Sequence, residues 1–270
     1  MKRIVAPTFI SLTRPLAEVL GQVAAAGVRL IELHGDAPDK HIDLTDDAAV
    51  AAAARVAAEV GLRIHSVHSP FSSPSEEDWD LSQPDPDKRR RAVENHSKVI
   101  RSAGRLGAAH VVMHAGVRNR GARHLANCRE SLRKLSTVAR EARVKIAVEN
   151  LAPGYLVGSV ADMVTMLDGL DRQTVGFCLD TGHAMLGADS PSDYVRALSD
   201  RIVAVHWHCN DGKEDTHTFP SNGNSGCREF LAALAEIGYD LPITVEAVPP
   251  DGVPLADAFN AARDAFAEMG

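Results

Sequence analysis

Short apolar segments alternate with longer amphipathic ones along almost the whole chain. The apolar segments lie at residues 3–9, 28–34, 62–68, 110–116, 145–150, 174–180, 202–208 and 242–247, a length typical of buried strands. The stretches between them space their apolar residues as helices do, and several end in a glycine just before the next strand: Gly27, Gly61, Gly107 and Gly238. Asp85-Pro86 and Ser190-Pro191 have the form of helix starts. The alternation predicts a parallel sheet with helices packed on it.

A closed barrel and an open doubly wound sheet both fit this alternation. Eight strands, a chain of 270 residues and the lack of a glycine-rich phosphate loop after the first strand favour the barrel. No linker or low-complexity tract divides the sequence, so residues 1–270 are expected to form a single (β/α)8 TIM-barrel domain. The longest connections follow the third and seventh strands, at the C-terminal face where barrel enzymes keep their active sites.

The composition of the chain limits the classes of partner that are expected. Hydrophobic residues make up 45% of the chain and charged residues 24%, as in ordinary globular proteins, and the net charge is −7. A negative net charge argues against nucleic acid as a partner, because proteins that bind nucleic acid usually carry a surface rich in lysine and arginine. No apolar run is long enough to span a membrane. The four cysteines are far apart and form no C-x-x-C pair, which predicts no disulfide framework and a cytoplasmic location.

Six consecutive predicted strands end in a side chain of the kind that binds metals: His68, His114, Glu149, Asp180, His208 and Glu246. Any one of them could be a buried histidine or a helix cap, but six in a row at one rim of a barrel indicate a metal site. Histidine and carboxylate ligands without cysteine suit manganese, cobalt, magnesium or zinc at a catalytic site.

Other polar residues are expected near the same rim. His183 follows Asp180 in "DTGH", and Asp215 and His217 are two residues apart in the loop after the seventh strand, so that both project to one side. His206 is expected to face inward beneath His208 and to support the ligands.

Three further residues are candidates for substrate contact. Trp79, in the loop after the third strand, either stacks on a ligand or packs under its own loop. Glu32 and His34 close the second strand and are placed at the mouth of the barrel.

The motifs "HSPF", "VVMHAG", "AVEN", "LDTGHA", "HCNDGKEDTH" and "TVEA" occur in this order on successive strands. In this they resemble the xylose-isomerase-like TIM-barrel superfamily, which contains sugar isomerases and epimerases, inosose isomerases and dehydratases, and endonuclease IV. The resemblance covers essentially the whole chain. It is specific for the superfamily and much less so for the substrate.

Two metal schemes follow from the resemblance. As in the isomerases and epimerases, one divalent ion would be held by Glu149, Asp180, His208 and Glu246, with the two glutamates as the acid/base pair. As in endonuclease IV, up to three zinc ions would be held by these residues together with His68, His114, His183, Asp215 and His217. All nine residue types are present.

The sequence departs from its relatives in two places. They usually carry a "GxG" just after the Asp-x-His, whereas this chain has "SNGN" from Ser221. The arginine with which many epimerases grip the substrate in this loop is missing, and Lys213, the nearest cation, is the candidate to contact the substrate there.

The resemblance implies a divalent-metal-dependent isomerase or epimerase acting on a sugar, sugar derivative or cyclitol. It would act by proton transfer next to a carbonyl, through an enediolate. The alternatives are a multinuclear zinc phosphoesterase acting on abasic-site DNA or a small phosphodiester, and a metal-dependent keto-cyclitol dehydratase. A barrel that binds without catalysis is a third class. The expected partner is a small sugar-like molecule, with nucleic acid disfavoured, no membrane, and self-association left open.

Overall fold

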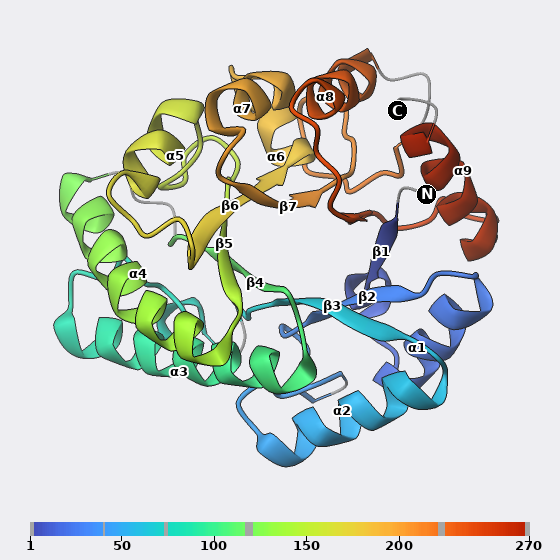
Figure 1. The fold of residues 1–270 in the computed structure, drawn as a ribbon, viewed down its shortest axis with the longest axis horizontal. Helices are drawn as coiled ribbons and strands as arrows, with labels where there is room; N and C mark the ends of the chain where they lie inside the picture. Colours follow the sequence, from blue (N-terminus) through green and yellow to red (C-terminus); the bar gives the residue numbers. More distant parts are fainter. Residues whose placement is uncertain (1–2, 40, 73–74, 117–120, 221–224, 268–270) are drawn as a thin grey trace.

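The eight strands pair in chain order, each parallel to its neighbours, and the last pairs with the first. The result is a closed barrel with helices packed around its outside (Figure 1). The computed structural model describes residues 3–39, 41–72, 75–116, 121–220 and 225–267, without the side chains of residues 225–228. The predicted (β/α)8 architecture is confirmed.

The strands are β1 (Ile4–Pro7), β2 (Leu30–His34), β3 (Arg63–His68), β4 (His110–His114), β5 (Lys145–Glu149), β6 (Val175–Asp180), β7 (Ile202–His206) and β8 (Ile243–Thr244). The helices are α1 (Leu16–Ala25), α2 (Asp47–Glu59), α3 (Pro86–Leu106), α4 (Ala122–Ala142), α5 (Val160–Leu167), α6 (Thr181–Met185), α7 (Pro191–Leu198), α8 (Ser225–Glu236) and α9 (Leu255–Ala267). Two short 3-10 turns, η1 (Thr8–Ser11) and η2 (Glu76–Asp78), lie in the loops after β1 and β3.

Helix boundaries follow the local signals in the sequence. The Asp85 carboxylate accepts hydrogen bonds from the backbone N–H groups of Asp87 and Lys88 at the start of α3. Ser190 and Asp193 form a reciprocal capping box at the start of α7. The four glycines expected at helix ends all adopt positive φ, which glycine reaches without steric cost.

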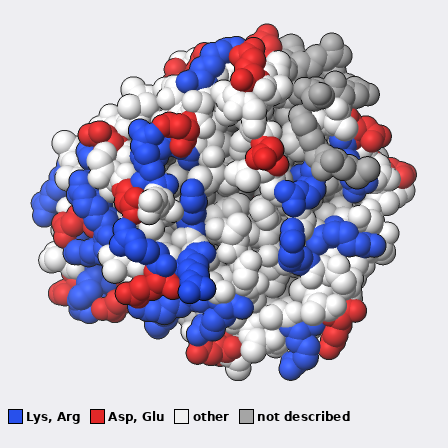
Figure 2. Space-filling view, in the orientation of Figure 1, with Lys and Arg blue, Asp and Glu red and all other residues white. Residues whose placement is uncertain are grey.

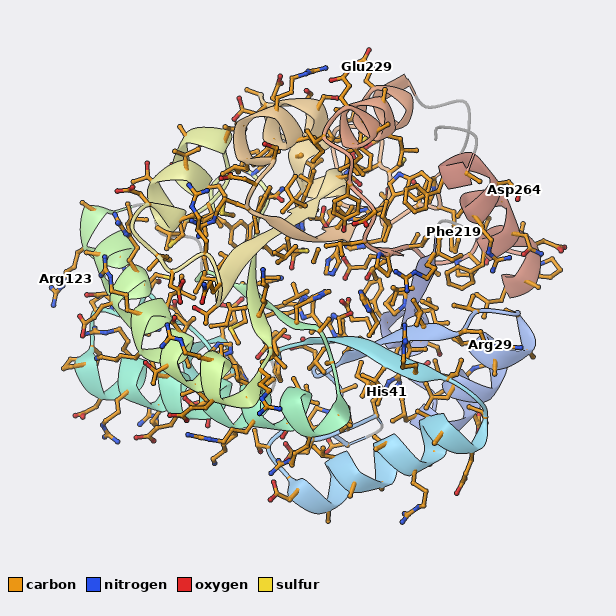
Figure 3. All side chains as sticks on the ribbon, in the orientation of Figure 1. Arg29, His41, Arg123, Phe219, Glu229 and Asp264 are labelled. Atoms are coloured by element: carbon orange, nitrogen blue, oxygen red, sulfur yellow. The ribbon has the colours of Figure 1, made fainter. Side chains whose placement is uncertain are left out.

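The core has two parts. The larger lies between the strands and the helices, while a smaller cluster inside the barrel consists of Val112, Ala147, Cys178 and Ala204. Successive residues of β4 show the alternation, because Val111 and Met113 belong to the outer core and Val112 to the inner cluster. Side chains fill the barrel, and polar residues of the outer helices such as Glu229 and Asp264 point away from it (Figure 3).

The last two strands are shorter than the sequence predicts. The apolar segments 202–208 and 242–247 contain strands of residues 202–206 and 243–244, so His208 and Glu246 lie two residues beyond their strands and the prediction that they end them is wrong. The chain leaves the parallel ladder after Trp207 and pairs with its own loop, because the backbones of Cys209 and Thr218 exchange two 2.9 Å hydrogen bonds.

One helix is additional to the predicted alternation. α6 follows β6 directly, and the Asp180 side chain caps it by accepting a 2.7 Å hydrogen bond from the backbone N–H of His183. The cap turns the chain back over the barrel mouth as soon as the strand ends.

No helix in the described ranges has both the length and the apolar character needed to cross a membrane. Cys128 and Cys178 are free and buried, whereas Cys209 is disulfide-bonded.

Replacing Gly104 by alanine is expected to destabilise the fold by about 1–3 kcal/mol. A Cβ at Gly104 would lie 2.7 Å from the carbonyl oxygen of Ala142, where α3 and α4 pack closely. The matched control is Gly21→Ala in α1, where an added Cβ meets nothing within 4 Å and the helix gains about 1 kcal/mol. Urea unfolding of the two variants checks both signs, and equal stability would contradict the close approach.

Candidate metal centre and active site

The register of the barrel brings histidines and carboxylates of neighbouring strands side by side. His34 is level with His68, His114 with Glu149, and Asp180 with His206. Because the C-terminal ends of parallel strands meet at one rim, these pairs face a common space.

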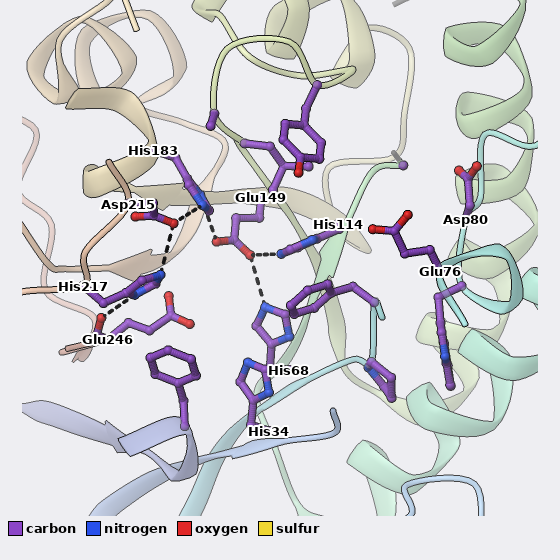
Figure 4. Close-up of a pocket in the computed structure, with 18 of the residues that line it drawn as sticks. His34, His68, Glu76, Asp80, His114, Glu149, His183, Asp215, His217 and Glu246 are labelled. Atoms are coloured by element: carbon purple, nitrogen blue, oxygen red, sulfur yellow. Dashed lines mark hydrogen bonds and ion pairs between the residues drawn. The ribbon is translucent and has the colours of Figure 1, made fainter. Parts of the chain in front are cut away.

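Glu149 is the centre of the first group of contacts (Figure 4). Its Oε2 atom lies 3.2 Å from Nε2 of His68 and 3.4 Å from Nε2 of His114. Its Oε1 atom lies 3.3 Å from Nδ1 of His206 and 3.6 Å from Nδ1 of His183. Glu149 is 1% exposed, so this carboxylate is satisfied almost entirely by imidazoles.

Asp215 joins the long loop after β7 to the rim. Its Oδ2 atom lies 3.1 Å from Nε2 of both His183 and His217. His217 also places Nδ1 2.9 Å from the backbone oxygen of Glu246 and has a φ of 44°, which is unusual for a residue with a side chain. The loop therefore holds Asp215 and His217 over the pocket, at the cost of a left-handed backbone.

Asp180 and His208 form a third contact, deeper in the barrel. Nε2 of His208 lies 3.0 Å from both carboxylate oxygens of Asp180. The Thr181 hydroxyl fixes the backbone here, because it donates to the carbonyl of His208 and accepts from its N–H. The His208 ring stacks on that of His217 at 4.0 Å.

His206 lies at the floor of the site and is fully buried. Its Nδ1 atom is 2.7 Å from Oε2 of Glu246, and its Nε2 atom is 3.1 Å from Oε1 of Glu32. Glu32 accepts a 2.7 Å hydrogen bond from Ser66 through its other oxygen. The predicted place of His206, facing inward, is confirmed, and Glu32 lies beneath the site rather than at its mouth.

Several sets of these residues have ligand atoms within 4.8 Å of one another, close enough to share an ion. One set is Glu149, Asp180, His206 and Glu246; the others are His68, His114 and Glu149; His208, His217 and Glu246; and His34, His68 and Glu246. From the sequence, His208 was expected as a ligand and His206 as its support. In the structure the four-residue set contains His206, whereas His208 belongs to the set with His217 and Glu246.

The donor atoms fit a divalent cation. Nδ1 of His208 is buried without a hydrogen-bond partner among the described residues, and such an atom is costly unless it binds something. Buried oxygen and imidazole nitrogen donors suit manganese, cobalt, magnesium or zinc.

The carboxylates also set the protonation of the histidines. Burial lowers the pKa of His183, but Asp180, Asp215 and Glu149 outweigh it and raise the pKa to about 10. Conversely, burial raises the pKa of the Glu149 carboxyl, and His206 and the other imidazoles hold it well below its ordinary value. The site therefore attracts positive charge, which protons or a divalent ion supply.

A cavity of about 320 Å³ opens above this floor. His34, His68, His114, Glu149, His183, Asp215, His217 and Glu246 line it, and Trp79 closes it from the loop after β3. Trp79 is 7% exposed and its ring contacts His96 edge-on, so it packs as one of the two alternatives predicts; stacking on a ligand stays a prediction.

Lys213 is exposed and does not line the cavity. The "SNGN" departure, residues 221–224, lies outside the described residues. Asn150 was not among the residues predicted from the sequence. Its side chain is fully buried, accepts a hydrogen bond from the backbone N–H of Asp180 and donates one to the carbonyl of Asp180. Its place directly after Glu149 in "AVEN" was the available signal. Phe9 and Tyr155 are further wall residues that were missed.

Comparison with known proteins decides the family. The sequence profile described as a xylose isomerase-like TIM barrel matches residues 20–269. The chain belongs to this family.

Three similar proteins illustrate the range of the xylose isomerase-like family. An uncharacterized protein of Methanocaldococcus jannaschii is 30% identical over 190 residues, covering 67% of this chain and 63% of that protein. A probable endonuclease 4 of Acholeplasma laidlawii is 29% identical over 191 residues, covering 66% and 61%. The match thus spans less than two thirds of either relative. The crystal structure of a D-tagatose 3-epimerase-like protein superposes with a TM-score of 0.83 at 23% identity, over 99% of this chain and 96% of that one, and shows the shared fold.

Replacing Gly182 by alanine is expected to lower metal affinity about 10–100-fold. An added Cβ would overlap the ring of His208, which is fully buried and would have to shift. Gly187→Ala is the control, because its Cβ would meet neighbours at 3.4–3.8 Å, an ordinary contact. Titration of the purified variants with manganese or zinc measures the effect, and unchanged affinity in Gly182→Ala would remove His208 from the metal centre.

Proposed function

We propose that the protein is a divalent-metal-dependent isomerase or epimerase that acts on a sugar, sugar derivative or cyclitol by moving a proton next to a carbonyl. The observation that carries the proposal is the pair Glu149 and Glu246, which come from different parts of the barrel and reach one cavity with carboxylate oxygens within 4.8 Å of each other. The cavity volume of about 320 Å³ is at the lower end of ligand-binding pockets and suits a molecule of sugar size.

Glu149 and Glu246 act as the general base and the general acid of the proposed proton transfer. One removes the proton from the carbon next to the carbonyl, giving an enediolate, and the other returns a proton to a neighbouring carbon or to the opposite face. Each positioned acid or base contributes about 10²–10⁴ in rate. Glu149, Asp180, His208 and Glu246, with His206 beneath them, would hold a divalent ion, which supplies Lewis-acid polarisation of the substrate oxygens.

The histidines at the pocket wall position the substrate. His183 lines the cavity with both ring nitrogens engaged, Nδ1 by the backbone oxygen of Asn150 and Nε2 by Asp215. It therefore holds the Asp215 carboxylate at the wall, where that carboxylate can accept a hydrogen bond from a substrate hydroxyl. Phe9 and Phe71 contact the rings of neighbouring histidines and narrow the entrance, which limits access of water.

A second candidate is a multinuclear zinc phosphoesterase. The observation in its favour is that His68 and His114 both contact Glu149, and that His183 and His217 both contact Asp215. Those contacts provide donors for ions beyond the first. A probable endonuclease 4 among the similar proteins gives this candidate its substrate class, a phosphodiester.

The test is proton exchange. Metal-loaded protein is incubated in D₂O with ketoses and keto-cyclitols, and loss of the proton next to the carbonyl is followed by nuclear magnetic resonance. Exchange in at least one compound is expected. No exchange in the whole panel, together with cleavage of abasic-site DNA or of bis(p-nitrophenyl) phosphate, would replace the proposal by the phosphoesterase.

A further inference from the structure

A second cavity lies at the opposite end of the barrel, where the strands begin. Its volume is about 490 Å³, and it is bordered by the end of α4 and by the starts of β4 and β5. His110 and Lys145, the first residues of these two strands, line it. The same strands end at His114 and Glu149, so about 13 Å of strand separates the two cavities.

The two cavities carry opposite charge. Among the described residues, the wall of the active-site cavity contains carboxylates and no lysine or arginine, whereas the second cavity is lined by Arg140, Arg143 and Lys145 and by no carboxylate. This is a local excess of positive charge in a chain of net charge −7. Such a cavity attracts anions.

The cavity is part of a wider basic face. Basic residues precede or begin most strands: Arg3, Arg29, Arg63, Lys145, Arg172 and Arg201. In Figure 2 lysine and arginine side chains surround a pale hollow in the middle of this face.

Cations at helix C-termini also stabilise the helix dipole, and this accounts for part of the pattern. Arg29 donates to the carbonyls of Ala24 and Val28 at the end of α1, and Arg140 pairs with Asp171 at 2.7 Å. No salt bridge or side-chain hydrogen bond joins Arg143 or Lys145 to any other residue that the structure describes. The charged groups of Arg143 and Lys145 are therefore available to bind an anionic ligand.

The backbone at Arg143 points to the same conclusion. Arg143 ends α4 with a φ of 58°, a left-handed conformation that is unfavourable for a residue with a Cβ. Five other helices are followed within two residues by a glycine of positive φ: Gly27, Gly61, Gly107, Gly169 and Gly238. Glycine would serve equally well at residue 143, yet arginine stands there. His217, in the active site, is the other described non-glycine residue with positive φ, and such strain tends to persist where a side chain has a function.

The uncharged residues that line the second cavity indicate what the ligand carries besides its negative charge. Val203 and Leu241 line the cavity, and Leu241 is 41% exposed, so an apolar group bound beside the two cations would cover it. Burial lowers the pKa of His110 to about 3, so its ring is neutral and adds a polar contact but no charge.

We propose that this cavity binds a small organic phosphate. Arg143 and Lys145 hold the phosphate, because a guanidinium and an ammonium together match its charge and its oxygen geometry. Val203 and Leu241 cover the apolar side of the body that carries it.

The test is calorimetric titration of the full chain with adenosine monophosphate and glucose 6-phosphate, with adenosine and glucose as uncharged partners. One site per chain is expected for the phosphorylated member of at least one pair, with at least tenfold weaker binding of its uncharged partner. Arg143→Gly and Lys145→Gln are each expected to weaken binding at least tenfold. Arg63→Gln, which removes a cation of the same face outside the cavity, should leave it unchanged.

Arg143→Gly adds a second readout. Because glycine relieves the left-handed strain, its melting temperature is expected to rise by a few degrees while phosphate binding is lost. A lower melting temperature with unchanged affinity would show that Arg143 serves the fold alone and would overturn the proposal.

Asp180→Asn separates the two cavities, because it alters the metal centre only. Phosphate binding is expected to persist in this variant. If binding were lost in Asp180→Asn and retained in Arg143→Gly, the phosphate would lie in the active site and the proposal would be wrong. The outcome is independent of whether the protein proves to be an isomerase.

Discussion

Glu149→Gln and Glu246→Gln are each expected to lose solvent-deuterium exchange into a substrate by a factor of about 10²–10⁴. Glutamine keeps the shape of the side chain and can neither take up nor return a proton. Both carboxyls are buried, at 1% and 4% exposure, so water cannot easily replace them as proton carriers. Exchange measured with each variant at saturating metal reports on the proton step directly.

A matched control is Glu77→Gln, which makes the same chemical change at an exposed residue paired with Lys88. It should exchange protons as the unaltered chain does. Metal content is measured alongside, so that loss of the ion is distinguished from loss of the acid or base. Full exchange in both active-site variants would remove the glutamates from the proposed mechanism.

Manganese or zinc is expected to raise the melting temperature, and a chelator to lower it. A ligand at about a hundred times its dissociation constant stabilises the folded state by about 2.7 kcal/mol, which corresponds to a rise on the order of 5–10 °C for a chain of this size. The physical reason is the concentration of buried carboxylates, since Glu149, Asp180 and Glu246 are at most 4% exposed and gain a counter-charge. Thermal unfolding with and without metal measures the shift.

Asp180→Asn is the control for metal-linked stability. Asparagine caps a helix about as well as aspartate, so α6 keeps its start while the site loses a charge, and the metal-dependent rise should largely disappear. Elemental analysis of the purified chain gives the stoichiometry. One ion per chain agrees with the isomerase proposal, whereas two or three zinc ions would favour the phosphoesterase.

Much of the candidate site could be predicted from strand ends. His68, His114, Glu149 and Asp180 each close a strand as expected, because a polar side chain after a buried apolar run marks the point where the chain reaches the rim. His208 and Glu246 reach the site although they lie beyond their strands. Their positions depend on where the parallel ladder stops, and that is decided by pairing with distant residues such as Thr218.

Other contacts could not be predicted because they depend on register and rotamer. Nothing in the local sequence places Nε2 of His206 against Glu32 on the far side of the barrel, or Asp215 between His183 and His217. Asn150 was missed for the same reason, since its role is to bond the backbone of the next strand.

The second cavity illustrates the limit most clearly. The basic residues before the strands are visible in the sequence, but the cavity exists only because the end of α4 and the starts of β4 and β5 meet there, and the left-handed φ of Arg143 has no sequence signal, since glycine is the residue that marks such positions.

The sequence by itself determined the eight-fold alternation, the strands' buried character, most helix ends and the identity of the polar residues at the rim. These depend on periodicity, capping and turn chemistry, which act between residues close in the chain. Only the tertiary structure decided which histidine meets which carboxylate, how deep each one lies, and that the two ends of the barrel carry opposite charge. Those properties arise when the barrel closes, because closure fixes the register between strands that are far apart in sequence.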